Sequence, residues 1–219
     1  MATKKKTKRA ATKTAAPKKR QTKAQKQAAA YREITRRNKI YAAATLAQKR
    51  VLIAKDVIAQ LKDNRFVAET GTWTDMWSSG DFPHAVGFQE TFLTDKSVSC
   101  NCCAVGSLFL GCTLYANKLL TDDIRADWSL GEDIISRKKF ANGFHKLFSP
   151  KQLALIELAF EGQTEFVMDD EDMDYTAPEL SVEEEMAAVG GYYNDFKSPK
   201  ARLIAIMENI VENNGTFEP

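Results

Sequence analysis

Apolar residues recur at intervals of three and four positions along most of this chain, a spacing that predicts α-helices with one buried face. Residues 23–64 contain neither glycine nor proline, so they predict one long helix or two nearly continuous helices. The apolar face strengthens toward the end of this stretch, at Ile53, Ala54, Val57, Ile58 and Leu61. We therefore expect the globular domain to begin near Tyr41 to Val51.

A different pattern follows the helical stretch. Residues 65–77, RFVAETGTWTDMW, alternate between apolar and polar side chains, which predicts a short strand or a hairpin ending near Gly71. Residues 78–87 contain serine, glycine and proline and predict a loop.

Later helices are marked by their start signals. Ser149, Pro150 and Gln152 predict an N-cap, a proline at the first helical position and a capping box, with Phe148 and Leu153 placed as a hydrophobic staple. Two further helices are expected to start at Ser181, with Glu184 completing a capping box, and at Ser198, with Pro199 next to it. The last helix carries an apolar stripe before its end at Asn214 and Gly215: Leu203, Ile206, Met207 and Ile210.

Residues 97–117 carry no charge, and their apolar part runs from Cys102 to Ala116. This part is shorter than the about 20 apolar residues that a membrane helix needs. It predicts a buried central helix. The predicted fold class is mainly α: a compact helical domain with a small β-hairpin element, preceded by a disordered basic tail and a long helix.

The uncharged segment contains all the cysteines of the chain: Cys100, Cys102, Cys103 and Cys112. Their spacing does not match the paired knuckles of structural zinc sites, and His84 and His145 are the only histidines that could complete such a site. A free cysteine behaves as a small apolar residue. We expect reduced cysteines packed in the core, with no disulfide, metal or other cofactor.

A cysteine-dependent hydrolase is the alternative for this segment. Ser99 could cap the helix and place three cysteines in its first turn, where the helix dipole lowers a thiol pKa, an arrangement that resembles papain-like amidases and peptidases. Those enzymes present their histidine from a strand, whereas His145 lies in a predicted amphipathic helix. The expected inward residues of that helix are Phe140, Phe144, Leu147 and Phe148. We therefore expect no enzyme and assign no catalytic residue.

Two other motifs are given structural interpretations. A calcium-binding loop could begin at Asp172, but Ala177 stands where its sharp turn needs glycine. Residues 136–157 could form a helix-turn-helix, but the acidic residues around them would repel DNA.

Charge divides the chain into blocks. Residues 1–50 hold 17 Lys and Arg against one acid, Glu33, whereas residues 51–219 hold 14 Lys and Arg against 28 Asp and Glu. Thirteen of these acids, and no Lys or Arg, lie in residues 152–196. We expect a disordered basic tail at 1–23, a basic helical extension at 24–50 and an acidic helical globular domain at 51–219.

The tail has no bulky apolar residue except Met1, so it cannot bury enough surface to offset its ordering entropy. It lacks the apolar stretch of a signal peptide, and its lysine content and scarce serine disfavour a transit peptide. Its segment KRAATKTAAPKKR resembles histone-like basic tails. It also resembles a bipartite nuclear-import signal, formed by Lys8-Arg9 and Lys18-Lys19-Arg20.

The segment CNCCAVGSLFLG, after the helical RVLIAKDVIAQL and together with the ending RLIAIMENIVENNGTFEP, resembles uncharacterised helical proteins of bacteria and their phages. The resemblance covers about residues 50–219 and implies no activity. It implies a cytoplasmic location in a bacterial or phage-infected cell. The resemblance of the tail to a nuclear-import signal implies a nuclear location if the protein acts in a eukaryotic cell.

The charge pattern predicts a non-enzymatic nucleic-acid-associated protein that binds the phosphate backbone through its basic N-terminal tail, without strong sequence specificity. The predicted contacts are Lys4, Lys5, Lys6, Lys8, Arg9, Lys13, Lys18, Lys19, Arg20, Lys23, Lys26, Arg32, Arg36, Arg37 and Lys39. The alternative is a phage-derived protein-binding regulator or inhibitor that uses the acidic surface of residues 152–196. Neither function needs a membrane.

Overall fold

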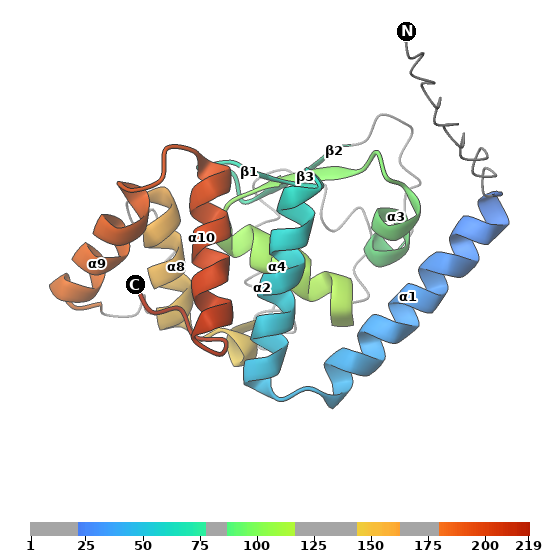
Figure 1. Cartoon of the computed structure of the whole chain (residues 1–219), viewed down its shortest axis with the longest axis horizontal. Helices are drawn as coiled ribbons and strands as arrows, with labels where there is room; N and C mark the ends of the chain where they lie inside the picture. Colours follow the sequence, from blue (N-terminus) through green and yellow to red (C-terminus); the bar gives the residue numbers. More distant parts are fainter. Residues whose placement is uncertain (1–21, 78–86, 117–143, 163–179) are drawn as a thin grey trace, which may run out of the picture.

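The structure, a computed structural model, describes residues 22–77, 87–116, 144–162 and 180–219 (Figure 1). Helices dominate these residues, as the sequence predicts, and a small sheet lies at one end of α2 and α10. In chain order the elements are α1 (Lys23–Ala43), α2 (Leu46–Lys62), β1 (Phe66–Ala68), β2 (Thr74–Trp77), α3 (Phe88–Thr94), β3 (Ser99–Cys102), α4 (Ala104–Ala116), α8 (Pro150–Glu161), α9 (Val182–Ala188), the π-helix η1 (Val189–Tyr193) and α10 (Pro199–Glu212).

The glycine-free stretch forms two helices, α1 and α2, which meet at an extended break around Ala44. Each helix begins with a capping box, made by Thr22 with Gln25 in α1 and by Thr45 with Gln48 in α2. Thr22 and Lys23, which the sequence assigns to the disordered tail, are instead the cap and the first residue of α1.

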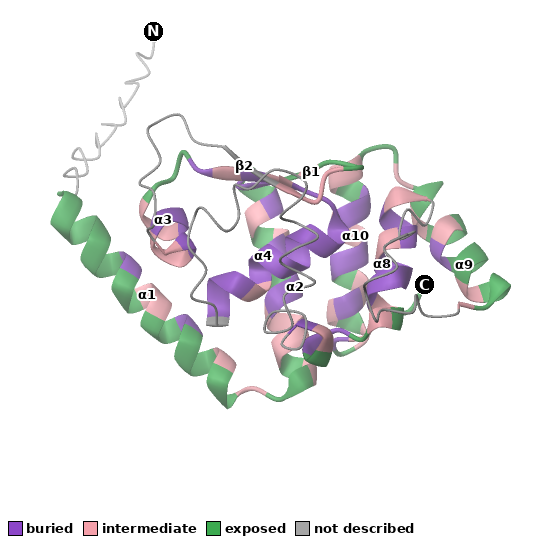
Figure 2. Ribbon diagram, turned by 180° about the vertical axis from the view of Figure 1, so that it is seen from behind, coloured by how far each residue is buried: buried purple, intermediate pink, exposed green. Residues whose placement is uncertain are grey.

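Helix α1 runs along one edge of the molecule and packs against α3 and α4 (Figure 1). Most of its residues are exposed, and only Ala30 and Arg37 are buried (Figure 2). The basic extension is therefore held on the helical domain by a narrow contact face.

Of the short strand or hairpin predicted to end near Gly71, the short strand is present as β1, and no hairpin forms because β1 and β2 do not pair with each other. The strand β3 lies between them, parallel to β1 and antiparallel to β2. Phe66 is in register with Cys100, and Thr74 with Cys102. Gly71 takes a positive φ of 69° in the turn that separates β1 from β2.

The predicted central helix is present as α4, but it begins at Ala104. Cys100 and Cys102 lie on β3, and not in the first helical turn where the hydrolase alternative would place them. The Cys103 N–H donates to the Thr72 carbonyl at 2.6 Å, which ties the start of α4 to the segment before β2. Gly106 packs directly against the Trp73 backbone carbonyl, where a Cβ atom would not fit.

Helix α4 forms the centre of the core, with α2, α3, α8 and α1 around it. The predicted stripe of α2 is buried at Ile53, Ala54, Val57 and Leu61, while Ile58 is half-buried. Figure 2 shows α4 and the inner faces of α2, α8 and α10 as the most continuously buried part of the molecule.

The C-terminal helices follow their sequence signals with one exception. Ser149 caps α8, but the Gln152 side chain does not complete a capping box. Its amide instead donates to the Phe217 carbonyl at 3.1 Å and accepts from the Phe217 N–H at 2.6 Å. Helix α8 thus holds the C-terminal segment that follows α10.

Helices α9 and α10 start as predicted. The capping box of Ser181 and Glu184 opens α9, and Ser198 with Pro199 opens α10. The stripe of α10 is fully buried against α2 and α8: Leu203, Ile206, Met207 and Ile210.

Several sequence interpretations lie outside the described residues: the tail up to residue 21, the acidic loop at Asp172, His84, and residues 136–143 of the possible helix-turn-helix. Within the described ranges, no helix combines the length and the apolar character that a membrane span requires.

Candidate functional site

The outward face of α1 carries a regular basic stripe. Arg32, Arg36 and Lys39 follow one another at intervals of four and three residues, so they project on the same side of the helix, and all three are exposed. Ala30 and Arg37 lie on the opposite side and are buried. We call Arg32, Arg36 and Lys39 the basic stripe.

The predicted nucleic-acid contacts divide into three groups. Those from Lys4 to Arg20 lie outside the described residues. Lys23 and Lys26 are exposed in the first turns of α1, before the basic stripe. Arg37 differs from the others because it faces inward, and its charge is used within the fold.

Arg37 anchors α1 through an ion pair with Asp56 of α2. The guanidinium Nη1 lies 3.0 Å from the Asp56 carboxylate, and the two side chains are 11% and 7% exposed. The Arg37 Nε–H also donates to Glu33 at 2.9 Å, and the guanidinium lies over the Tyr115 ring at 5.1 Å. Burial lowers the pKa of Arg37, but its contacts with Asp56 and Glu33 more than offset this and raise it overall, so the residue stays charged.

Glu33 is shared between the anchor and the basic stripe. Arg36 donates to it from Nε at 2.8 Å and from Nη2 at 2.6 Å. The hydrogen bond from Arg36 is the largest cause that lowers the pKa of Glu33 to about 2, with Arg37 adding to it. Glu33 therefore stays ionised and offsets part of the Arg36 charge.

Further contacts fix both ends of α1. Near its start, the Tyr31 hydroxyl and the Gln27 amide each donate to the Glu90 carboxylate of α3 at 3.0 Å. Near its end, the Tyr41 ring stacks on Tyr115 of α4 with centroids 5.7 Å apart. These contacts leave the basic stripe facing away from the domain.

The cysteines are packed as small apolar residues, as the sequence predicts. Cys100, Cys102 and Cys103 are buried, Cys112 is half-buried, and none of the four forms a disulfide. Burial is the main cause that raises the thiol pKa of Cys102, Cys103 and Cys112. Raised pKa values disfavour the thiolate that a cysteine nucleophile needs.

His145 is partly buried. It lies in the helical turn that packs Phe144, Leu147 and Phe148 inward, as expected, and burial lowers its pKa. One group of acidic and thiol side chains among the described residues consists of Cys103, Glu157 and Glu161.

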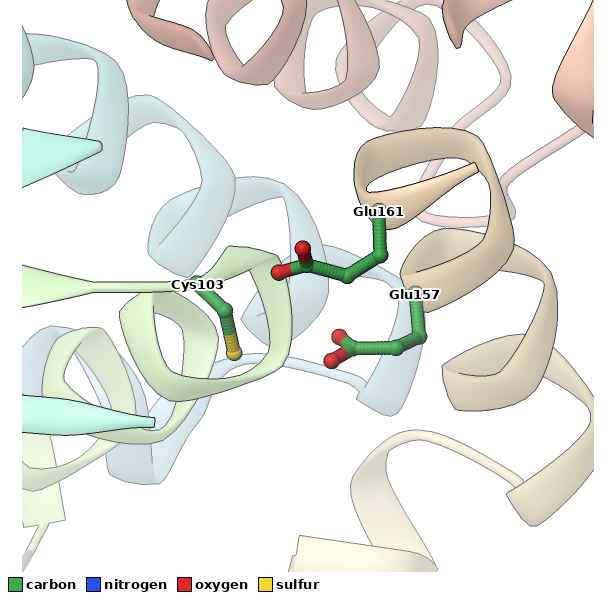
Figure 3. Close-up of side chains that lie close together, drawn as sticks. All are labelled: Cys103, Glu157 and Glu161. Carbon is green, nitrogen blue, oxygen red and sulfur yellow. The ribbon is translucent and has the colours of Figure 1, made fainter. Parts of the chain in front are cut away.

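This group of Cys103, Glu157 and Glu161 is a chemically concentrated site that the sequence patterns did not suggest. Both glutamates project from α8 toward the start of α4, where Cys103 lies (Figure 3). One ligand atom from each residue lies within 4.8 Å of the other two. We call these three residues the thiol–carboxylate cluster.

Backbone groups orient two members of the thiol–carboxylate cluster. The Gly106 N–H donates to Cys103 Sγ at 3.3 Å from the first turn of α4. The Gly71 N–H donates to the Glu161 carboxylate at 3.0 Å. A sequence signal did exist: Glu157 and Glu161 are four residues apart on a helix that is otherwise apolar around them, so they share one face.

Comparisons with known proteins give no further guidance on function. No protein-family model matches the chain, and neither the curated proteins nor the solved structures contain a significant match.

Proposed function

We propose that this protein binds nucleic acid non-enzymatically, through the phosphate backbone and without strong sequence specificity. Its contacts are the lysines and arginines of the N-terminal residues and the basic stripe of α1. The observation that supports this proposal is the orientation of α1, which buries Arg37 and exposes Arg32, Arg36 and Lys39 on one face.

The dimensions of the basic stripe suit a phosphate backbone. Arg32 and Lys39 are seven residues apart, which corresponds to about 10 Å along a helix. Phosphates of one strand follow each other at about 3.4 Å along a duplex axis, so the stripe spans about three of them. No base-reading group is needed for this contact.

The tail supplies most of the charge. Residues 1–39 carry 15 Lys and Arg against one Glu, a net charge of +14. Neutralising phosphates with these groups releases condensed counterions, so affinity falls steeply with salt, with a logarithmic slope on the order of −5 if about six phosphates are neutralised.

A binding titration with fluorescent duplex DNA and single-stranded RNA tests the proposal. Replacing the basic stripe by Arg32→Gln, Arg36→Gln and Lys39→Gln should weaken binding and make the salt slope shallower. Its matched control is Lys55→Gln, Lys62→Gln and Lys96→Gln, which removes three exposed positive charges outside α1. The control should bind as the parent does.

Deleting residues 1–21 keeps α1 and its capping box intact and should remove most of the affinity. Binding that is insensitive to salt and survives this deletion would overturn the proposal, because the folded domain would then recognise the ligand itself.

A protein-binding regulator is the second candidate, and α9 is the observation that favours it. Val182 and Met186 are 67% and 70% exposed, beside the acidic residues Glu183, Glu184 and Glu185. Such a surface suits a basic protein partner with apolar side chains. This function predicts that the intact chain fails to bind DNA or RNA even at low salt.

A further inference from the structure

The thiol–carboxylate cluster has the ligand chemistry of a metal site. It combines one sulfur ligand and two carboxylates, contributed by the residue before α4 and by one face of α8 (Figure 3). Zinc is bound by cysteine thiolates at about 2.3 Å and by carboxylates at about 2.0–2.2 Å. We propose that Cys103, Glu157 and Glu161 bind one divalent transition-metal ion, with Zn²⁺ as the ion that best suits these ligands.

The geometry is close to what a tetrahedral ion requires. With those bond lengths, neighbouring ligand atoms lie about 3.4–3.6 Å apart around the ion. The ligand atoms of the cluster lie within 4.8 Å of one another. Closure on an ion therefore needs movements on the order of 1 Å, which rotations of the glutamate side chains and a small shift of Cys103 at the start of α4 supply.

The position of Cys103 fixes the direction of its sulfur. Its side chain is 3% exposed, yet it accepts the Gly106 N–H from the first turn of the thirteen-residue helix α4. The Gly106 N–H favours the thiolate form, but burial and the charge of Glu157 outweigh it and keep the pKa of the thiol raised while no ion is bound. The thiolate form is the form that binds a metal.

Ligand type decides which ions are excluded. Mg²⁺ and Ca²⁺ prefer six or more oxygen ligands and gain little from a sulfur ligand. The cluster offers three ligands from the protein, so the ion keeps a position for water. The site is thus distinct from the calcium loop considered at Asp172, and it does not depend on the proposed nucleic-acid function.

Metal binding has to displace the thiol proton of Cys103. Burial, followed by the charge of Glu157, raises the pKa of this thiol. Affinity should therefore rise with pH, and binding should release about one proton per ion.

The test is a titration of the reduced, chelator-stripped full chain with Co²⁺, followed by displacement with Zn²⁺. We expect one Co²⁺ per chain, a thiolate-to-cobalt charge-transfer absorption in the near ultraviolet, and its loss when Zn²⁺ is added. Cys103→Ala should abolish this absorption. Cys112→Ala, which removes a cysteine of α4 outside the cluster, should retain the charge-transfer absorption.

The glutamates are tested with isosteric variants. Glu157→Gln and Glu161→Gln should each weaken binding at least tenfold, a loss on the order of those seen when groups supporting a metal are removed. Glu208→Gln, an exposed acid on α10, should have no effect. Circular dichroism checks the fold of each variant. If Cys103→Ala does not fold, the affinity of the Glu157→Gln/Glu161→Gln double variant for the ion tests the proposal instead.

Two results would overturn the inference. One is a parent chain that shows no charge-transfer absorption with Co²⁺. The other is a bound ion that the folded Cys103→Ala chain, or the double glutamine variant, retains with the parent's affinity.

Discussion

At the scale of single residues, Arg37 shows what a sequence pattern leaves open. It lies among exposed cations of α1, and neither composition nor spacing distinguishes it from Arg36. Its partner Asp56 belongs to the next helix, so the pairing depends on how α1 folds back on the domain. A buried ion pair contributes little net stability, but losing one partner leaves an uncompensated buried charge.

Replacing Asp56 by Ala should therefore lower the free energy of unfolding by about 3 kcal/mol, because Arg37 loses its buried partner and keeps only the more exposed Glu33. Urea denaturation measures the change. The double variant Arg37→Met/Asp56→Leu is the control. Its free energy of unfolding should fall much less, since neither of the two charges remains in the buried site. A single variant that unfolds at the parent's midpoint would contradict this account.

Glu33 predicts a pH dependence at the same scale. Its pKa is about 2 in the folded chain, against an ordinary value of 4.5. A lowered folded pKa means that the contribution of Glu33 is complete above pH 4.5 and is lost as the pH falls toward 2. Urea midpoints measured between pH 5 and pH 2.5 should converge for the parent and Glu33→Gln. A constant difference across this range would refute the role assigned to Glu33.

At the scale of elements, local signals predicted the helices well and the sheet poorly. Ser181, Ser198 and the stripe of α10 act within a few residues of themselves, so their pattern is visible in the sequence. The strand β3 pairs with β1 and β2, which are distant from it in the sequence. Without knowledge of this pairing, the apolar residues after Ser99 predict a helix and not a strand. The thiol–carboxylate cluster escaped prediction for the same reason, because α4 and α8 meet only in the folded chain.

The start of α4 gives a prediction for an element. Gly106 lies against the Trp73 carbonyl, and a Cβ atom there would overlap this backbone oxygen. Gly106→Ala should lower the free energy of unfolding by about 3 kcal/mol, since the helix and the segment before β2 must move apart. Thermal and urea denaturation measure the loss. Gly190→Ala, where a Cβ atom meets nothing within 4 Å, is the control and should keep the parent's stability.

At the scale of the whole molecule, the charge blocks oppose each other. Residues 1–39 carry +14 and residues 152–196 carry −13, and the screening length at physiological ionic strength is about 8 Å. If the tail binds nucleic acid as proposed, we expect nucleic acid to compete with the protein's own acids for it.

Neutralising part of the acidic block should strengthen nucleic-acid binding. We expect the variant Asp169→Asn/Asp170→Asn/Glu171→Gln/Asp172→Asn to bind DNA about threefold more tightly, an effect within the range of exposed charge interactions. Fluorescence anisotropy at matched salt measures this. The gain should disappear when residues 1–21 are deleted from both chains, and a gain that persists there would point to direct repulsion of DNA by the acids.

The path of α4 through the core has a thermodynamic consequence. One end of this helix carries Cys103, and Tyr115, twelve residues on, supports the ring of Tyr41 in α1. The two ends are about 18 Å apart, yet they belong to one packed helix that shifts as a unit. If the proposed ion shifts the Cys103 end, the position of α1 at the other end should change with it. Linkage would then require reciprocity: whatever factor the proposed ion applies to the proposed nucleic-acid affinity, nucleic acid must apply to the affinity for the ion.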